Sequence, residues 1–429
     1  MKTSTNKFLL LFILLCFFYP AITFSQGTIK NDSLFSSSLG IYKKVTVYLP
    51  QGYDSLSTLR YRTIYLLHGA QGNQNYYSAF YTKFDTLIAN NTIKPTIIVM
   101  PDASAQPYAG SFYTNSILYG NYENYIYIDV IGYIDTKYKT LASRNNRSIA
   151  GHSMGGFGAM NLAFKHSDLF RGTASISGPL DLNHFADLSF YLQLENGFAP
   201  PITYNPANGI VTLLSFSLAG ALSPNLSAPP YYVDFILNSN AQVVDSVFTK
   251  WKTQNPARLS RNITAATNLA LYFDCGLQDE LTLSGWNTAF RDTLLLRGIP
   301  FQYTSYTGGH TNMLGSRIPF ALNFLDSAMD FPTNIIQGSV TPDDYSLEQN
   351  YPNPFNPSTT INFSLPVNSF VNLKVFDMTG REVANLINQN LIAGAHEINF
   401  NAAHLTSGIY FYRLDTENFS ETKKMMLVK

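Results

Sequence analysis

The sequence predicts an α/β fold followed by a smaller, separate all-β domain. From Lys44 to Met329, short apolar segments of strand length alternate with amphipathic segments of helix length. This pattern is typical of a mostly parallel sheet with helices on both faces. After Pro332 the composition changes, and only strand patterns separated by turns follow. A chain of 429 residues is long enough for a large core and a second module.

The first domain is expected to span residues 26–332. Apolar runs predict its strands at Val45–Leu49, Thr63–Leu67, Thr96–Met100, Arg147–Ala150, Gly172–Ile176, Leu269–Asp274 and Phe301–Ser305. Amphipathic segments predict helices at Tyr77–Ala89, Tyr122–Tyr138, Gly156–His166, Gly285–Arg297 and Arg317–Met329. Between residues 182 and 262 the alternation lapses, and Pro, Asn, Ser and aromatic residues are frequent. An insertion of this size is either a cap over the site or a surface elaboration, and we expect this one to shape the pocket.

The carboxyl-terminal domain is expected to be a β-sandwich over residues 345–429, after a polar linker at 333–344. Apolar and polar residues alternate with a period of two in Thr360–Leu365, Asn372–Asp377, His396–Asn401 and Gly408–Asp415. These segments carry no cluster of catalytic side chains.

The first 25 residues read as a secretory signal peptide. Lys2 and Lys7 supply positive charge, Phe8–Tyr19 is apolar, and small residues surround the expected cleavage site after Ser25. The alternative is a membrane anchor, but the apolar run is shorter than the roughly 20 residues that span a bilayer. We therefore expect export and no stable membrane span.

Charge and cysteine content exclude several classes of partner and site. The 28 basic residues balance the 28 acidic ones, so nucleic acid is not an expected partner. Cys275 is the one cysteine beyond the signal peptide, so no internal disulfide is expected. It follows a predicted strand, and we expect a small buried side chain there. The histidines show no metal-ligand spacing, and no nucleotide-binding loop is present, so no metal or cofactor is predicted.

The strongest chemical signal is Gly151-His152-Ser153-Met154-Gly155, which lies between a predicted strand and a predicted helix. In this context the glycines permit the sharp turn that exposes a nucleophilic serine at the helix N-terminus. Ser153 is therefore the candidate nucleophile.

A serine nucleophile needs an imidazole as base and a carboxylate that orients it. His310 follows the strand predicted at Phe301–Ser305 and is the candidate base. The acid is expected in the loop after Leu269–Asp274, where Asp279 is the first choice and Glu280 the second. Asp274, at the strand end, is a third option.

The tetrahedral intermediate requires backbone N–H donors. The expected donors are the amide of Met154, directly after the nucleophile, and the amide of Ala70 in the loop Leu67-His68-Gly69-Ala70. His68 and His152 either line the mouth of the same site or support its loops by hydrogen bonding.

Several motifs together resemble the esterase branch of the α/β-hydrolases, which includes S-formylglutathione hydrolases, feruloyl and acetylxylan esterases of carbohydrate esterase family one, and mycolyltransferases. They are Tyr65-Leu66-Leu67-His68-Gly69, Ile98-Val99-Met100-Pro101-Asp102, Gly151 to Gly156, Asp274-Cys275-Gly276 with Asp279, and Gly309-His310. The resemblance covers roughly residues 40 to 330 and implies an α/β-hydrolase fold. It implies Ser153, Asp279 and His310 as nucleophile, acid and base.

The tail resembles a type A sorting domain of the type IX (Por) secretion system. The motifs are residues 347–357, Asp377-Met378-Thr379-Gly380-Arg381, and Gly408-Ile409-Tyr410-Phe411-Tyr412. The resemblance implies passage through the periplasm and outer membrane of a Bacteroidetes-like bacterium, by means of residues 345–429. A carbohydrate-binding sandwich is the alternative.

The expected function is that of a secreted or cell-surface serine esterase that removes feruloyl or acetyl groups from plant polysaccharide or oligosaccharides through an acyl-enzyme on Ser153. An S-formylglutathione hydrolase-like thioesterase and an acyltransferase use the same chemistry. A displayed, non-catalytic binding protein on a hydrolase scaffold is the alternative from another class.

Overall fold

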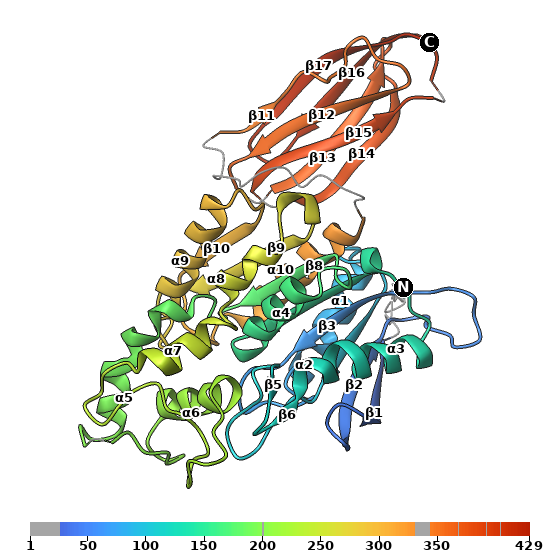
Figure 1. Cartoon of the computed structure of the whole chain (residues 1–429). Coiled ribbons are helices and arrows are strands. Elements are labelled where there is room, and N and C mark those ends of the chain that lie inside the picture. Colours follow the sequence, from blue (N-terminus) through green and yellow to red (C-terminus); the bar gives the residue numbers. More distant parts are fainter. Residues whose placement is uncertain (1–25, 200, 331–343, 368, 392, 404) are drawn as a thin grey trace, which may run out of the picture.

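The computed structural model describes residues 26–330, except 200, and residues 344–429, except 368, 392 and 404 (Figure 1). The predicted signal peptide lies outside the described residues, as does all of the predicted linker except Asp344. None of the helices in the described ranges is both long enough and apolar enough to cross a membrane.

The first part of the chain is built on an eight-stranded sheet in the order β1-β2-β4-β3-β7-β8-β9-β10. The strands are β1 Thr28–Ser36, β2 Ile41–Leu49, β3 Arg62–Leu67, β4 Thr96–Pro101, β7 Arg147–His152, β8 Gly172–Ile176, β9 Ala270–Gly276 and β10 Gln302–Tyr306. The pairs β1–β2 and β2–β4 are antiparallel, and all other neighbours are parallel. Each predicted strand is confirmed, and β1 is an additional edge strand.

Helices cover both faces of this sheet because apolar side chains of successive strand residues point to opposite sides. Tyr65 and Ile149 pack in one core cluster with α4 residues, whereas Ile64 and Ala150 pack in the other with α10 residues. The main helices outside the insertion are α1 Tyr81–Ala89, α3 Ile131–Lys137, α4 Met154–Lys165, α9 Leu283–Leu296 and α10 Leu314–Asp330, and all five predicted helices are represented. Shorter elements in the same region are η1 Ser78–Phe80, α2 Tyr122–Asn124, the π-helical turn η2 Tyr125–Val130, η3 Arg144–Asn146, and the strands β5 Asn115–Ser116 and β6 Gly120–Asn121.

The insertion at 182–262 is mainly helical, which the sequence pattern did not indicate. Its elements are η4 Leu182–Leu188, α5 Ser189–Glu195, α6 Ile210–Leu222, α7 Asp245–Lys252, α8 Pro256–Leu259 and η5 Ser260–Asn262, followed by η6 Ala265–Thr267. Nearly every side chain of α6 is buried. A helix that is apolar on all sides has to lie inside the protein, and hydrogen bonds from Ser116 and Tyr119 to α6 carbonyls attach it to the loop after β4.

The carboxyl-terminal residues form two antiparallel sheets, β11-β12-β15 and β14-β13-β16-β17. The strands are β11 Ser346–Leu347, β12 Ser358–Leu365, β13 Ser369–Asp377, β14 Glu382–Leu391, β15 Gly394–Asn401, β16 Gly408–Asp415 and β17 Ser420–Leu427. Ile361 and Phe363 of one sheet share a buried cluster with Leu373 and Tyr412 of the other. This region is therefore an all-β sandwich, as the alternating pattern predicts.

Candidate active site

Ser153 occupies a sharp turn between the end of β7 and the start of α4. Its backbone has φ 55° and ψ −118°, a combination that a residue with a side chain rarely adopts. The amide of Ser153 donates a hydrogen bond of 2.8 Å to the carbonyl of Ile176 at the end of β8, which fixes the turn. A strained serine in a strand-to-helix turn is the geometry of a nucleophile elbow.

The two glycines of the motif are required because the turn presses backbone against backbone. A Cβ at Gly151 would lie 2.3 Å from the carbonyl oxygen of Gly155. A Cβ at Gly155 would lie 2.1 Å from the carbonyl oxygen of Leu67 in β3. Only glycine allows α4 to begin this close to the carboxyl end of the neighbouring strand.

The structure brings Ser153, His310 and Asp279 together in one chain of hydrogen bonds. The distance from His310 Nε2 to Ser153 Oγ is 2.9 Å, and the distance from His310 Nδ1 to Asp279 Oδ2 is 2.8 Å. A carboxylate only accepts hydrogen bonds, so Nδ1 carries the proton and Nε2 accepts the serine hydroxyl. This is the hydrogen-bonding arrangement that prepares a hydroxyl for attack on a carbonyl group.

Asp279 is held as an ionised, oriented carboxylate. Its side chain is 0% exposed, and it also accepts hydrogen bonds from the amide of Leu281 at 2.9 Å and from the thiol of Cys275 at 3.5 Å. Burial alone would raise the pKa of Asp279, but the interaction with His310 and these further donors outweigh it and lower that pKa. Cys275 is buried, as expected.

The other two candidate acids have different partners. Glu280 accepts a hydrogen bond of 2.7 Å from the backbone amide of His310, so it supports the loop and not the imidazole ring. Asp274 lies within β9 and forms an ion pair of 2.8 Å with Arg317. Of the three carboxylates, Asp279 is therefore the one bonded to the ring.

His152 positions the loop that carries His310. Its Nε2 donates a hydrogen bond of 2.9 Å to the backbone carbonyl of His310, and its Nδ1 accepts one of 2.8 Å from the hydroxyl of Tyr76. Burial and the neighbouring His310 lower the pKa of His152 to about 3, so the ring is neutral at neutral pH. The sequence left open whether His152 lines the site or supports its loops, and both ring nitrogens are used in support.

His68 is likewise occupied by structural hydrogen bonds. Its Nδ1 lies 2.7 Å from the carbonyl of Gly69, and its Nε2 accepts a bond of 2.9 Å from the amide of Ala103. Burial lowers the pKa of His68 to about 4. This side chain ties the loop after β3 to the loop after β4.

The two expected oxyanion donors lie in adjacent segments. Met154 is the first residue of α4, where amide groups have no partner within the helix. Ala70 lies in the turn after β3, and Leu67 at the end of that strand pairs with Gly151 of β7. Within the described residues, the amide of Ala70 has no hydrogen-bond partner. Their use as oxyanion donors stays a prediction.

A narrow apolar cavity of about 50 Å³ adjoins Ser153. Most of its walls come from the insertion and from the start of α9. The lining residues are Phe112, Ser153, Met154, Pro179, Phe185, Leu188, Val211, Leu214, Ser215, Leu218, Leu281, Leu283 and Trp286, of which none is charged. The described residues contain no group of three His, Cys, Asp or Glu side chains that could hold a metal ion.

Solved structures share the fold of the first domain. A ferulic acid esterase aligns with 71% of this chain and 100% of its own, at 22% sequence identity and a TM-score of 0.51. A fluorophosphonate-binding serine hydrolase of Staphylococcus aureus aligns with 70% of this chain and 99% of its own, at 20% identity and a TM-score of 0.50. At these identities the similarity is one of fold.

Two curated relatives match over part of their length. An esterase of Mycobacterium tuberculosis (strain H37Rv) is 32% identical over 161 residues, which are 36% of this chain and 34% of the relative. An endo-1,4-beta-xylanase/feruloyl esterase of Xylanibacter ruminicola is 30% identical over 168 residues, 36% of this chain and 22% of the relative. The chain thus spans about a third or less of these relatives.

Family models match both domains. Residues 349–429 match the secretion system C-terminal sorting domain, which points to secretion or a cell-surface location. Residues 36–314, more than half of the chain, match the family described as "Putative esterase". With the α/β sheet and the serine elbow on the same residues, the chain belongs to this esterase family.

Proposed function

We propose that the protein is an exported serine carboxylic-ester hydrolase that releases hydroxycinnamoyl groups such as feruloyl from plant polysaccharide or oligosaccharides. The observation that carries the proposal is the hydrogen-bonded chain from Asp279 through His310 to Ser153, which opens on an uncharged, apolar cavity.

The catalytic cycle uses these groups in two halves. Ser153 Oγ attacks the ester carbonyl while its proton passes to His310 Nε2, and Asp279 stabilises the resulting imidazolium. The amides of Met154 and Ala70 bind the oxyanion. The carbon–oxygen bond to the sugar then breaks, and His310 returns the proton to the departing hydroxyl. Water then attacks the acyl carbon while His310 Nε2 takes its proton. The bond from that carbon to Ser153 Oγ breaks, His310 returns the proton to Oγ, and the acid leaves.

The acyl pocket favours an aromatic acyl group that carries oxygen substituents. Its walls are apolar, which suits a ring, yet two of its lining residues contain a buried polar atom with no partner in the described part of the chain. These atoms are Ser215 Oγ and Trp286 Nε1. The cavity of about 50 Å³ is smaller than the roughly 150 Å³ that holds a benzene ring, so the aromatic acyl group has to widen it on binding. A buried polar atom without a partner costs about 1–3 kcal/mol, which a phenolic or methoxy oxygen would recover once the widened pocket brings it to these atoms. An acetyl group offers no such oxygen beyond its carbonyl.

In the proposed function, the order of the segments along the chain serves export followed by catalysis. A signal peptide at 1–25 directs export, an esterase domain at 26–332 carries the cap at 182–262, and a linker leads to the sorting domain at 345–429. The match of residues 349–429 to the sorting-domain model supports passage through a type IX secretion system of a Bacteroidetes-like bacterium.

The test compares wild type and Ser153→Ala on methyl ferulate, nitrophenyl acetate and S-formylglutathione. Loss of such a nucleophile is expected to reduce kcat about a millionfold, and a fluorophosphonate probe should label only the wild type. Equal rates for the two proteins would rule out the mechanism, and failure of the probe to label wild type would favour a non-catalytic binding protein. Turnover of the thioester alone would move the assignment to a thioesterase.

The acyl preference is tested separately with Ser215→Ala and Trp286→Phe. Both variants are expected to lose rate on methyl ferulate by about fivefold to a hundredfold, in line with one lost hydrogen bond, and to keep the rate on nitrophenyl acetate. Equal losses of rate on both substrates would show that the two polar atoms do not distinguish between acyl groups.

A further inference from the structure

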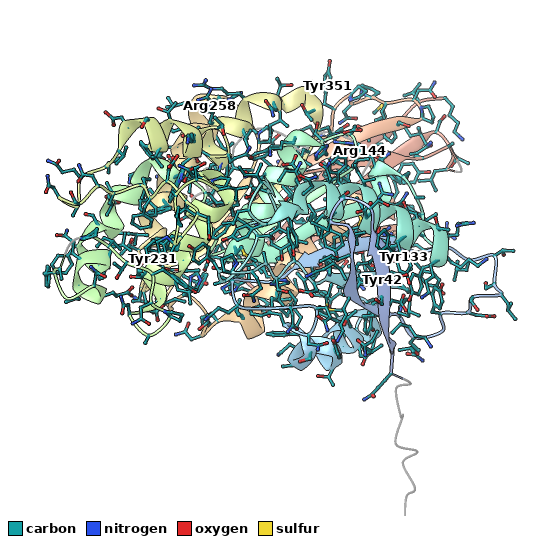
Figure 2. All side chains as sticks on the ribbon, turned by 60° about the horizontal axis from the view of Figure 1, so that its bottom comes forward. Tyr42, Tyr133, Arg144, Tyr231, Arg258 and Tyr351 are labelled. Carbon is teal, nitrogen blue, oxygen red and sulfur yellow. The ribbon has the colours of Figure 1, made fainter. Side chains whose placement is uncertain are left out.

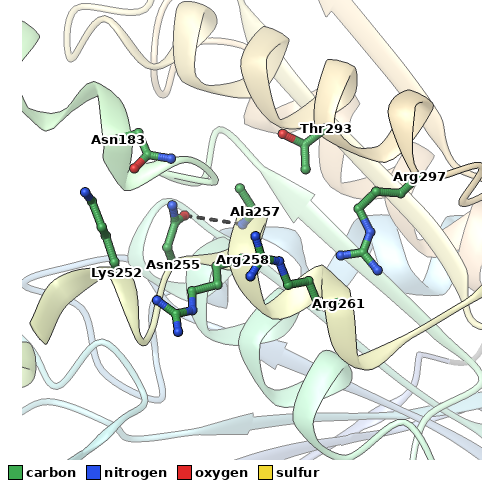
Figure 3. A pocket seen from close by; sticks show the side chains of 8 residues that line it. All are labelled: Asn183, Lys252, Asn255, Ala257, Arg258, Arg261, Thr293 and Arg297. Carbon is green, nitrogen blue, oxygen red and sulfur yellow. Dashed lines mark hydrogen bonds between the residues drawn. The ribbon is translucent and has the colours of Figure 1, made fainter. Parts of the chain in front are cut away.

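A second cavity, of about 330 Å³, has a lining that does not include Ser153. It is formed by η4, the end of α7, α8, η5 and the end of α9, and Figure 3 shows its lining side chains. Lys252 enters from one side and Arg297 from the other, with Arg258 and Arg261 between them. The neutral residues that complete the lining are Asn183, Asn255, Ala257 and Thr293.

The cavity concentrates positive charge that the described protein does not neutralise. All its lining residues lie in the described part of the chain, and none of them is acidic. None of the four basic side chains forms an ion pair with a described residue. Asp181 is the carboxylate behind Asn183 and Asn255, and it is buried and bonded to their amide groups. The chain has a formal net charge of zero, so the four positive side chains at this cavity are a local cluster and do not reflect a basic composition.

The guanidinium group of Arg297 is only partly satisfied by the described residues. Its Nε is buried and has no hydrogen-bond partner among the described residues, and its Nη1 makes one long contact of 3.5 Å with Ser260 Oγ. Burial and the nearby charge of Arg261 lower the pKa of Arg297. The exposed Arg258 projects from the surface of the molecule (Figure 2), so a ligand can approach from solvent.

Helix α9 connects this cavity to the acyl pocket. Leu283 and Trp286, near the start of α9, line the acyl pocket, whereas Thr293 and Arg297, at its end, line the basic cavity. At 1.5 Å per residue, Trp286 and Thr293 are separated by about 10 Å along the helix. A saccharide of a few residues can span such a distance.

We propose that this basic cavity binds the carboxylate of an acidic sugar residue in the polysaccharide that carries the ester. Guanidinium groups match the two oxygens of a carboxylate, and the amide of Asn183 and hydroxyl of Thr293 suit sugar hydroxyls. The volume lies within the range of small-molecule sites, about 300–1,000 Å³, and exceeds what a lone inorganic ion fills. The choice of a sugar acid rests on the proposed action on polysaccharide, whereas the preference for an anion does not.

The experiment measures binding by calorimetry in the Ser153→Ala background, so that its result does not depend on catalysis. A xylo-oligosaccharide that bears a glucuronic acid branch is compared with the unbranched neutral oligosaccharide and with inorganic phosphate. We expect the acidic oligosaccharide to bind at least about tenfold more tightly than the neutral one, with affinity that falls as salt is raised. The double substitution R258Q/R261Q should remove this difference.

The matched control is Arg291→Gln, because Arg291 lies on the same helix and pairs with Asp292. This variant should keep the preference for the acidic oligosaccharide. The double variant R258Q/R261Q that retains Ser153 should hydrolyse nitrophenyl acetate at the wild-type rate. Equal binding of the acidic and neutral oligosaccharides, or an unchanged preference in R258Q/R261Q, would overturn the proposal. Binding of phosphate without binding of the acidic oligosaccharide would overturn the sugar assignment.

Discussion

The adjacent acids Asp279 and Glu280 allow a sharp test, because each bonds a different part of His310. Asp279 accepts from ring Nδ1, whereas Glu280 accepts from the backbone amide. In Asp279→Asn, an amide N–H would face Nδ1 and favour the tautomer with the proton on Nε2, which cannot accept from Ser153. The expected loss in kcat is about 10⁴-fold, or about 5.5 kcal/mol of activation free energy.

Glu280→Gln keeps an acceptor oxygen for the His310 amide and loses only its charge. We expect a cost of about 1 kcal/mol, or about a fivefold loss in kcat. Both variants are assayed on nitrophenyl acetate across a pH range, with circular dichroism as a check of folding. A folded Asp279→Asn enzyme within tenfold of wild type, or a larger loss in Glu280→Gln, would refute the assignment of the acid.

Three further predictions concern the frame around the site. Gly155→Ala should abolish ester hydrolysis because its Cβ would overlap a carbonyl oxygen of β3. Gly285→Ala, which has open space around its Cβ within a helix, should raise the unfolding free energy by up to about 1 kcal/mol. Ester assays measure the first effect and urea denaturation the second. His68 and His152 stay neutral in the fold until about pH 4 and about pH 3, but the unfolded chain takes up their protons near pH 6.5. The unfolding free energy should therefore fall as pH drops from 6.5 to 4, by about 1.4 kcal/mol per pH unit for each histidine, and His68→Gln should flatten this slope. A pH-independent unfolding free energy would contradict that reasoning. Tyr76→Phe removes the donor to His152 and should lower kcat about threefold to tenfold while KM changes little; unchanged kcat would show that this contact is dispensable.

Most of the first domain could be predicted from the sequence because its central parallel strands β3, β4, β7, β8 and β9 are buried on both faces and appear as short apolar runs. Helix α6 was not predicted, since Ile210–Leu222 is apolar on all sides and lacks the stripe that marks a surface helix. Strand β1 was missed because Thr28–Ser36 is largely exposed and alternates weakly. Whether such a segment forms a helix or a strand depends on the distant segments that pack against it. The sequence of the segment alone does not show which segments those are.

In the site, too, residues marked by a local motif could be predicted, whereas contacts between distant segments could not. Ser153 and His310 follow from motifs at strand ends, and the structure places their side chains in contact. The choice between Asp279 and Glu280 depends on which carboxylate reaches the ring, and their neighbouring positions do not settle that. The support by His152 joins a side chain to a backbone carbonyl 158 positions away, and no sequence pattern marks such a bond.

The walls of the acyl pocket and the reacting groups come from different segments of the chain. Val211, Leu214 and Leu218 of α6 line the cavity beside Ser153, yet this helix contains none of the groups proposed for bond breaking. Substitutions there can enlarge, narrow or polarise the chamber while the proton-transfer machinery keeps its geometry. Acyl preference is thereby separable from turnover, and α6 is the natural segment to randomise when a variant with a new ester selectivity is sought.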